Sequence, residues 1–155
     1  MGKTSTTVVR EGLQAFADRR VFRNFTEEKR KDGTVRFRFL YLDGNVVHLE
    51  FSERNQVLVI RNLLKQVPAR MYAELQAFLE KLSDPDLPPY RRVDRGSADA
   101  RFVKKKGSVS LVFTVKRNRY KYGVDKLVNL MSWVRSHLQG EHQQYLWEVM
   151  GEPED

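Results

Sequence analysis

Between residues 34 and 52 the sequence alternates apolar and polar side chains with a period of two, and the triplet Asp43-Gly44-Asn45 divides the alternating stretch. A strand that buries one face and solvates the other produces this alternation, and Asp, Gly and Asn suit the backbone of a tight turn. The stretch therefore predicts an antiparallel hairpin with one apolar face, formed by Val35, Phe37, Phe39 and Tyr41 and by Val47, Leu49 and Phe51.

A third apolar run, VLVIRNLL at residues 57–64, follows the hairpin and is apolar on both faces. We expect a third strand there, better covered than the first two. If helices cover only one face of the sheet, a second subunit or a client peptide could contact the apolar residues opposite the main stripes, namely Leu40, Leu42, Leu58, Ile60 and Val112. The alternative is that the third strand is central and that helices cover both faces.

Three other segments repeat apolar residues at helical spacing. The first covers residues 8–21. Pro68 fits the first turn of the second helical segment, because the first turn of a helix does not need the N–H group that proline lacks. The third runs from Val124, is interrupted near Gly140 and is followed by a further apolar helical segment. A second hairpin is predicted between residues 99 and 116, with Lys106-Gly107 near its turn.

The predicted elements follow the order helix, three strands, helix, two strands, helix. This order predicts an α+β fold, in which an antiparallel sheet of about five strands carries helices on one face. A length of 155 residues suits one domain with a single core, between residues 8 and 150. We interpret the proline-rich segment 84–89 as an internal loop and expect residues 151–155 to fray.

Composition excludes several classes of protein. The chain has no cysteine, which rules out disulfides, thiol nucleophiles and thiolate metal sites. No apolar run approaches the roughly 18 to 20 residues that a membrane-spanning helix needs, so we expect no membrane insertion. Residues 1–12 lack the hydrophobic stretch of a secretory signal, and the expected location is the cytoplasm.

The histidines and acidic residues form no recognisable catalytic or metal-binding motif. His48 falls on the polar face of its strand, and His137 and His142 are five residues apart across a helix break, whereas a helical metal pair is four apart. Solvent exposure accounts for all three. Asp84 and Asp86 lie beside prolines, as turn residues do. We therefore expect no catalytic residue, no metal, no cofactor and no enzymatic activity.

Positive charge is concentrated in residues 90–123, which contain eleven Lys and Arg and two Asp, so the remainder of this +8 chain is nearly neutral. Cations that neutralise phosphates, next to rings that stack on bases, favour a nucleic-acid site, and an acidic protein is the alternative ligand. A solvated strand face is the third interpretation. Arg36 and Arg38 extend this surface if the two hairpins are neighbours. The candidate binding residues are Arg101, Lys104, Lys105, Lys106, Lys116, Arg117, Arg119, Tyr120, Lys121 and Tyr122.

The order of elements resembles the type III secretion chaperone-like fold and the bacterial YbjN family that shares it. The segments that carry the resemblance are the VRFRFLYLDGNVVHLEF hairpin, VLVIRNLL leading through Pro68 into the second helix, SVSLVFTVK and the closing QQYLWEVM. The resemblance implies a small cytoplasmic protein, often dimeric and non-enzymatic, that holds an extended segment of another protein or serves a regulatory pathway. Secretion chaperones of this fold tend to be acidic, whereas this chain is basic.

Two hypotheses about function follow. The first is a chaperone-like binding protein or regulatory adaptor that engages a protein partner and forms a homodimer. The second is a nucleic-acid-binding protein that uses the basic region 90–123.

Overall fold

A computed structural model describes residues 4–41 and 45–151 of the chain. The predicted turn residues Asp43 and Gly44, the apolar residue Leu42 and the tail 152–155 lie outside the described residues. The elements are α1 (Ser5–Asp18), β1 (Phe22–Lys29), β2 (Val35–Tyr41), β3 (Asn45–Ser52), β4 (Val57–Leu64), α2 (Ala69–Lys81), the 3₁₀ turn η1 (Pro89–Arg91), β5 (Ala98–Lys105), β6 (Ser108–Val115), α3 (Tyr120–Glu141) and α4 (Gln143–Glu148).

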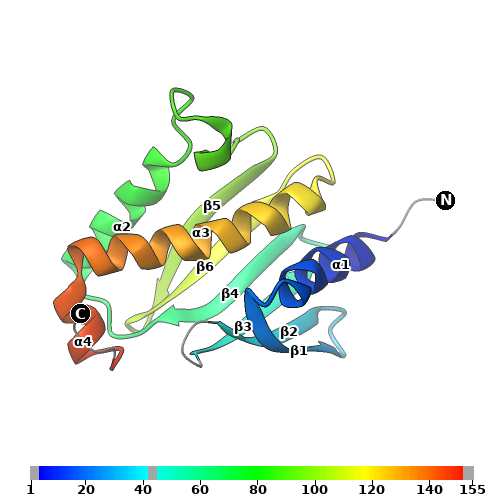
Figure 1. Cartoon of the computed structure of the whole chain (residues 1–155), viewed down its shortest axis with the longest axis horizontal. Helices are drawn as coiled ribbons and strands as arrows, with labels where there is room; N and C mark the ends of the chain where they lie inside the picture. The colour runs from blue at the N-terminus through cyan, green and yellow to red at the C-terminus, as the bar shows by residue number, and fades with distance from the viewer. Residues whose placement is uncertain (1–3, 42–44, 152–155) are drawn as a thin grey trace.

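In the described part of the chain, six strands form one antiparallel sheet in the order β1-β2-β3-β4-β6-β5 (Figure 1). The predicted class, an α+β fold with helices packed on an antiparallel sheet, is therefore confirmed. Strand β4 is central, because it pairs with β3 on one side and with β6 on the other. It therefore lies between the two predicted hairpins, β2–β3 and β5–β6, which are not adjacent.

Strand β1 is one strand more than the sequence predicted, and a bulge explains why its pattern was missed. The register with β2 shifts between Arg23 and Thr26, where Asn24 has a φ of 55°. A bulge adds a residue to one strand of a pair, so the apolar residues Phe22 and Phe25 no longer fall on alternate positions. The strand also lies at the edge of the sheet, where charged side chains are common.

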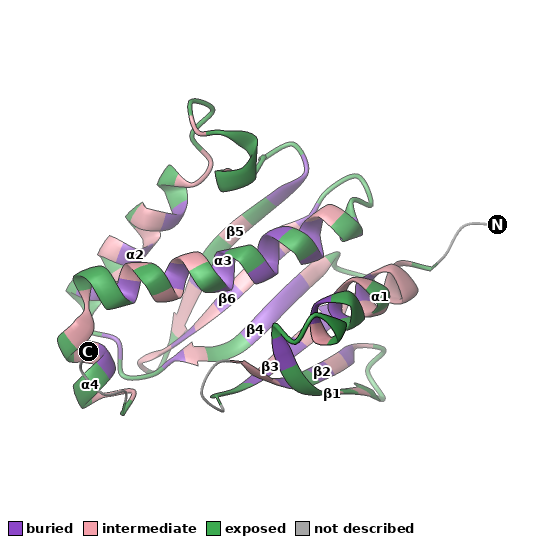
Figure 2. Cartoon of the chain, in the orientation of Figure 1, coloured by how far each residue is buried: buried purple, intermediate pink, exposed green. Residues whose placement is uncertain are grey.

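The helices α1, α2 and α3 lie on one face of the sheet, and α3 runs across the middle of it (Figure 1). The sides of the helices that face the sheet are buried and their outer sides are exposed (Figure 2). The buried residues form one hydrophobic cluster between the two layers. Its largest members include Phe37, Phe51, Leu58, Leu111 and Phe113, each at most 1% exposed.

The two faces of β4 are the reverse of the prediction. Leu58 and Ile60 were expected opposite the main stripe, but they are 0% and 1% exposed and belong to the core. Because both faces of this strand are apolar, its periodicity does not show which face turns inward. Val57 and Val59 lie on the face away from the helices, which the described helices leave uncovered.

The helix boundaries follow local capping. Helix α1 begins at Ser5, three residues before the predicted start, because the Thr4 hydroxyl accepts a hydrogen bond from the Thr7 N–H at 3.2 Å. Pro68 is the N-cap residue of α2 rather than a residue of its first turn. The interruption predicted near Gly140 occurs at His142, where φ is −136° and α3 gives way to α4.

Side chains of α2 cover the outer edge of β5. The Gln76 amide oxygen accepts a hydrogen bond from the Phe102 N–H, and the Gln76 amide nitrogen donates to the Phe102 carbonyl, both at 3.2 Å. The Tyr72 hydroxyl donates to the same carbonyl at 3.0 Å. Backbone groups of an edge strand otherwise remain available to another chain. Along the described residues, no helix is long and apolar enough to cross a membrane.

Candidate functional site

The uncovered face of the sheet is built from every second residue of its strands, and the register aligns residues of neighbouring strands in rows across the sheet. Arg36 lies opposite Glu50, Glu50 opposite Val59, Val59 opposite Val112, and Val112 opposite Arg101. Side chains at paired positions project to the same face. Arg36 therefore lies on the same face as the second hairpin, but β3 and β4 separate its strand from β6, so the condition of adjacent hairpins is not met.

A groove of about 730 Å³ lies on this face, over β4, β6 and β5. It joins apolar and cationic side chains within one concave surface, and serines of β6 supply hydroxyl groups between them. Such a surface suits a ligand that presents aliphatic and acidic groups together. Among its lining residues, we call the four valines, Val57, Val59, Val103 and Val112, the floor of the groove, and the four cations, Arg61, Arg101, Lys105 and Lys106, its rim.

Glu50 is surrounded by arginines beside this groove. Its carboxylate accepts hydrogen bonds from Arg36 at 2.9 Å, from Arg61 at 3.0 Å and from Arg30 at 3.3 Å. Burial by itself raises the pKa of Glu50, but the hydrogen bonds and charges of Arg36 and Arg61 outweigh burial and lower the pKa below its usual value. One carboxylate shared among three guanidinium groups leaves this part of the face with excess positive charge.

Most of the ten basic and aromatic residues predicted as one binding surface lie toward the two ends of the second hairpin, whereas Arg101 lies in the middle of β5. Lys105 and Lys106 are at its turn, where Lys106 and Gly107 have φ values of 52° and 84°. Lys116, Arg117 and their neighbours follow β6 at the opposite end. The eight residues of β5 separate the ends by roughly 25 Å at 3.2–3.4 Å per residue.

The basic residues after β6 hold the loop that enters β5. The Lys116 ammonium donates to the Arg95 carbonyl at 2.8 Å, and the Arg117 guanidinium donates to the Gly96 carbonyl at 3.0 Å. Arg119 donates to the Ser97 hydroxyl at 2.8 Å. These contacts give the three cations a structural role in the loop 94–97.

The two tyrosines proposed as base-stacking residues pack against the protein itself. Tyr120 is 4% exposed, and its ring meets Phe51 edge to face with centroids 5.5 Å apart. The Tyr122 hydroxyl accepts a hydrogen bond from the Asp94 N–H at 2.8 Å, and the Arg119 guanidinium lies 5.0 Å from the Tyr122 ring centroid. In this conformation Tyr120 has no free ring face to offer a base.

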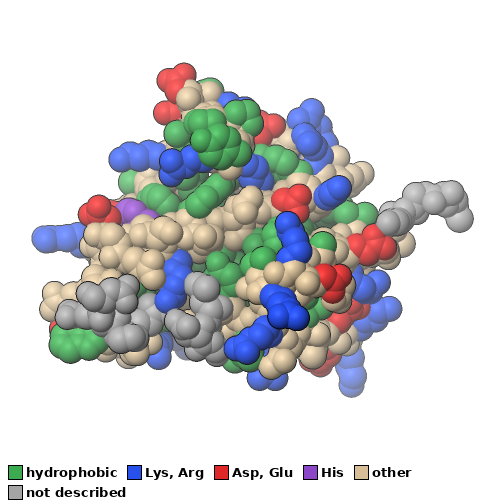
Figure 3. All heavy atoms as spheres, viewed as in Figure 1, with side chains coloured by type: hydrophobic (Ala, Val, Ile, Leu, Met, Phe, Trp, Pro, Cys, Tyr) green, Lys and Arg blue, Asp and Glu red, His purple; other side chains and the backbone are tan. Residues whose placement is uncertain are grey.

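The remaining candidates divide between the two faces of the sheet. Arg101 and Lys105 lie on the uncovered face and line the groove. Lys104 points to the other side, with its ammonium 5.8 Å from the Tyr72 ring centroid, and Lys121 is exposed in the first turn of α3. On the helix-bearing face, lysine and arginine side chains form several separate groups with acidic side chains among them (Figure 3).

The histidines show the largest departure from the sequence interpretation. His137 Nε2 lies 2.5 Å from Glu74 Oε1, and His142 Nε2 lies 3.1 Å from Glu74 Oε2. The interpretation of His137 and His142 as unrelated solvent-exposed residues was therefore wrong. The helix break near Gly140 is the one local signal of this cluster, and nothing in the sequence around Glu74 marks it as a partner.

Comparisons with known proteins add no assignment to these sites, because no protein-family model, curated protein or solved structure matches the chain. The YbjN family remains a prediction from element order and apolar pattern.

Proposed function

We propose that the protein is a non-enzymatic binding protein whose uncovered sheet face engages an acidic, aliphatic segment of a protein partner. The observation that carries the proposal is the groove over β4, β6 and β5, which combines a floor of valines with a rim of four cations. Concave apolar surface bordered by charge favours a partner of complementary chemistry over water. The chaperone-like or adaptor role implied by the resemblance requires a surface of this kind.

Charge selects among protein partners. Glu50, which lies between Arg36 and Arg61, is already engaged by arginines, so additional carboxylates have to come from the partner. The positive potential of the face attracts acidic segments and repels basic ones. Partners that also carry Leu, Ile or Val should bind more tightly to the valine floor, because burial of apolar area stabilises the complex.

Two features favour a protein over a nucleic acid as the ligand of this face. The described strand residues on it include no Phe, Tyr or Trp, whereas proteins that bind single strands stack bases on such rings. The valine floor also offers neither charge nor hydrogen-bond donors to a phosphate backbone.

Peptide display against the full-length protein tests the proposal. Selected peptides are expected to combine Asp or Glu with aliphatic residues, and salt is expected to weaken their binding without abolishing it. Arg101→Glu should weaken binding about tenfold or more, because it replaces attraction by repulsion at the rim. Lys121→Glu makes the same charge change outside the groove and should leave the affinity unchanged. Selected peptides without acidic residues, or equal binding by Arg101→Glu, contradict the proposal.

Nucleic-acid binding is the second candidate function, and the arginines that β2 and β5 place on one face favour it. Fluorescent single- and double-stranded oligonucleotides titrated across a salt series distinguish the two candidates. For a nucleic-acid-binding protein, the logarithm of the binding constant falls linearly with the logarithm of the salt concentration. Simultaneous reversal of Lys104, Lys105 and Lys106 to Glu should make the slope of this line less steep. Absence of binding at low salt removes this candidate.

Homodimerisation is a further part of the proposal. The uncovered face offers aliphatic surface to a second copy, with Val46 44% exposed. Sedimentation equilibrium of the full chain tests the dimer. A mass of 18.2 kDa at micromolar concentration identifies a monomer and leaves the face to other partners.

A further inference from the structure

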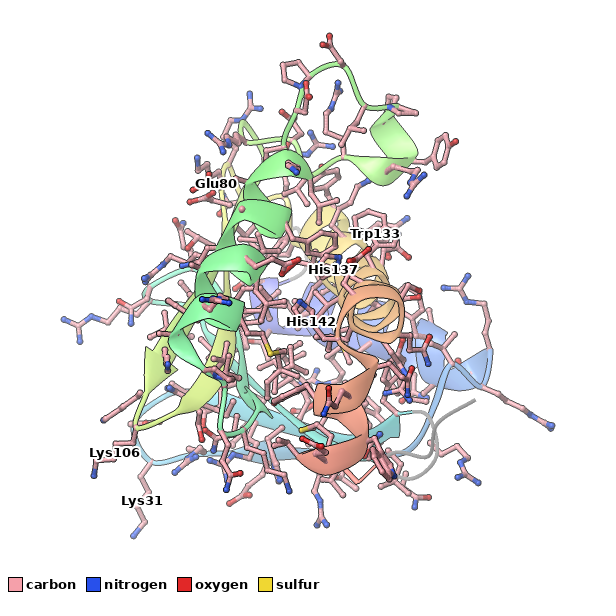
Figure 4. All side chains as sticks on the ribbon, turned by 90° about the vertical axis from the view of Figure 1, so that its left-hand side faces the viewer. Lys31, Glu80, Lys106, Trp133, His137 and His142 are labelled. Atoms are coloured by element: carbon pink, nitrogen blue, oxygen red, sulfur yellow. The ribbon has the colours of Figure 1, made fainter. Side chains whose placement is uncertain are left out.

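A cluster of two imidazoles and one carboxylate lies away from the groove, where α2 faces the junction of α3 and α4. Glu74 belongs to α2, His137 to the last turns of α3, and His142 to the break between α3 and α4. Figure 4 shows both imidazoles on the side of α3 that faces α2. The three side chains are 39%, 16% and 19% exposed, so the cluster is partly buried and still open to solvent.

The helix break brings the two imidazoles together. In a continuous helix, residues five apart project about 140° from each other around the axis, which would direct His142 away from His137. The backbone of His142 leaves the helical conformation, and its ring centroid lies 5.6 Å from that of His137. Phe78 stacks on the His137 ring with centroids 4.1 Å apart and planes 10° apart, which fixes the orientation of that ring.

Each imidazole directs its Nε2 atom to the same carboxylate. The Nε2 atom of His137 lies 2.5 Å from Glu74 Oε1 and that of His142 lies 3.1 Å from Glu74 Oε2. One ligand atom from each of the three residues can be chosen so that all lie within 4.8 Å of one another. Two histidine nitrogens and one glutamate oxygen thus converge, and Zn²⁺ is bound by this set of three protein ligands.

We propose that Glu74, His137 and His142 form a Zn²⁺ site that ties α2 to the α3–α4 junction. Bonds of about 2.0–2.1 Å in tetrahedral geometry separate two ligand atoms by about 3.3 Å, so the side chains reach this geometry through shifts on the order of 1 Å. The ion accepts the Nε2 lone pairs of two neutral imidazoles and an oxygen of the carboxylate, and water completes its coordination. Cobalt and nickel ions share the preference for such ligands.

The site is tested with the full-length protein after chelator treatment and buffer exchange. Calorimetric titration with Zn²⁺ should show one equivalent bound. The melting temperature should rise by about 5–10 °C at a free Zn²⁺ concentration about 100-fold above the dissociation constant, because the ion binds the folded state. Co²⁺ should bind competitively and give the visible absorption of a low-symmetry complex with nitrogen and oxygen ligands.

Three variants separate a built site from adventitious binding. His142→Ala and Glu74→Gln should each weaken Zn²⁺ binding on the order of 100-fold, since loss of a residue behind the ligands already costs about 10- to 100-fold. His48→Ala removes the histidine that lies on the sheet and should bind as the wild type does. The metal-free melting temperature of each variant shows whether it folds.

The proposal is overturned if the wild type binds no Zn²⁺, or if His142→Ala and Glu74→Gln bind it as tightly as His48→Ala. In either case the cluster is a hydrogen-bonded network between two histidines and a glutamate.

Discussion

Gln76 offers a direct test of how this fold protects its β5 edge. The side chain reaches from α2 to both backbone groups of Phe102, accepting from the N–H and donating to the carbonyl. Its amide nitrogen also donates to the Tyr72 hydroxyl at 3.2 Å. The Gln76 amide thus provides the backbone N–H and carbonyl of Phe102 with the hydrogen-bond partners that a neighbouring strand would provide.

Gln76→Leu keeps the approximate size and helix propensity of the side chain and removes these bonds. A hydrogen bond contributes a net stabilisation of about 0.5–1.5 kcal/mol, so loss of the two bonds to Phe102 should cost about 1–3 kcal/mol. For a chain of this length each kcal/mol lowers the melting temperature by about 2–4 °C. Calorimetry or thermal unfolding followed by circular dichroism measures the change.

Gln14→Leu is the matched control, because Gln14 is an exposed residue of α1 whose amide donates to Asp18 one turn away. Its effect should stay within about 0.5 kcal/mol. Hydrogen exchange adds a local measurement, since the Phe102 amide should exchange faster in Gln76→Leu than in the wild type. Equal stability losses in the two variants, with unchanged exchange at Phe102, would refute the role assigned to Gln76.

Two further predictions concern packing and pH. Gly123→Ala should destabilise the protein by about 1–3 kcal/mol, because the new Cβ meets Val115 Cγ2 at 2.8 Å, whereas Gly140→Ala has nothing within 4 Å and should stabilise α3 by up to about 1 kcal/mol. Chemical denaturation measures both, and similar effects would contradict the close approach of α3 to β6. The pKa of Glu50 is lower in the folded protein than the value of about 4.3 in an unfolded chain. The ionised Glu50 carboxylate therefore stabilises the fold fully above about pH 4.3, and this stabilisation is lost as the pH falls through the pKa of the folded state. Glu50→Gln should therefore be less stable than the wild type at pH 7, and the difference should shrink below about pH 4 in denaturation curves; a constant difference contradicts the lowered pKa.

The elements that the sequence predicted are those whose burial follows a local period. The apolar residues of β2, β3 and β6 occupy alternate positions, and those of α2 and α3 repeat at helical spacing, so each pattern identifies its element without knowledge of the neighbours. Strand β1 escaped prediction because the bulge at Asn24 breaks the period of two. The faces of β4 were reversed because both of them are apolar.

The candidate binding surfaces depend on the arrangement of these elements in space. The pairing of β4 with β6 brings Arg61 and Arg101 to one groove, although the charge pattern of the sequence had grouped Arg101 with Arg117 and Arg119. A strand of eight residues spans roughly 25 Å. Cations at the two ends of a hairpin therefore fall within one basic stretch of the sequence and yet lie far apart in space.

By itself the sequence determined the class of the fold, most of its elements and the surplus of positive charge, because these depend on residues within a few positions of one another. Only the tertiary structure decided which face of the sheet stays uncovered and which side chains converge. Glu74 lies 63 residues before His137, and their contact depends on how α2 and α3 pack over the sheet. No local period records such packing, because it is set by strand order and by the contacts of distant helices.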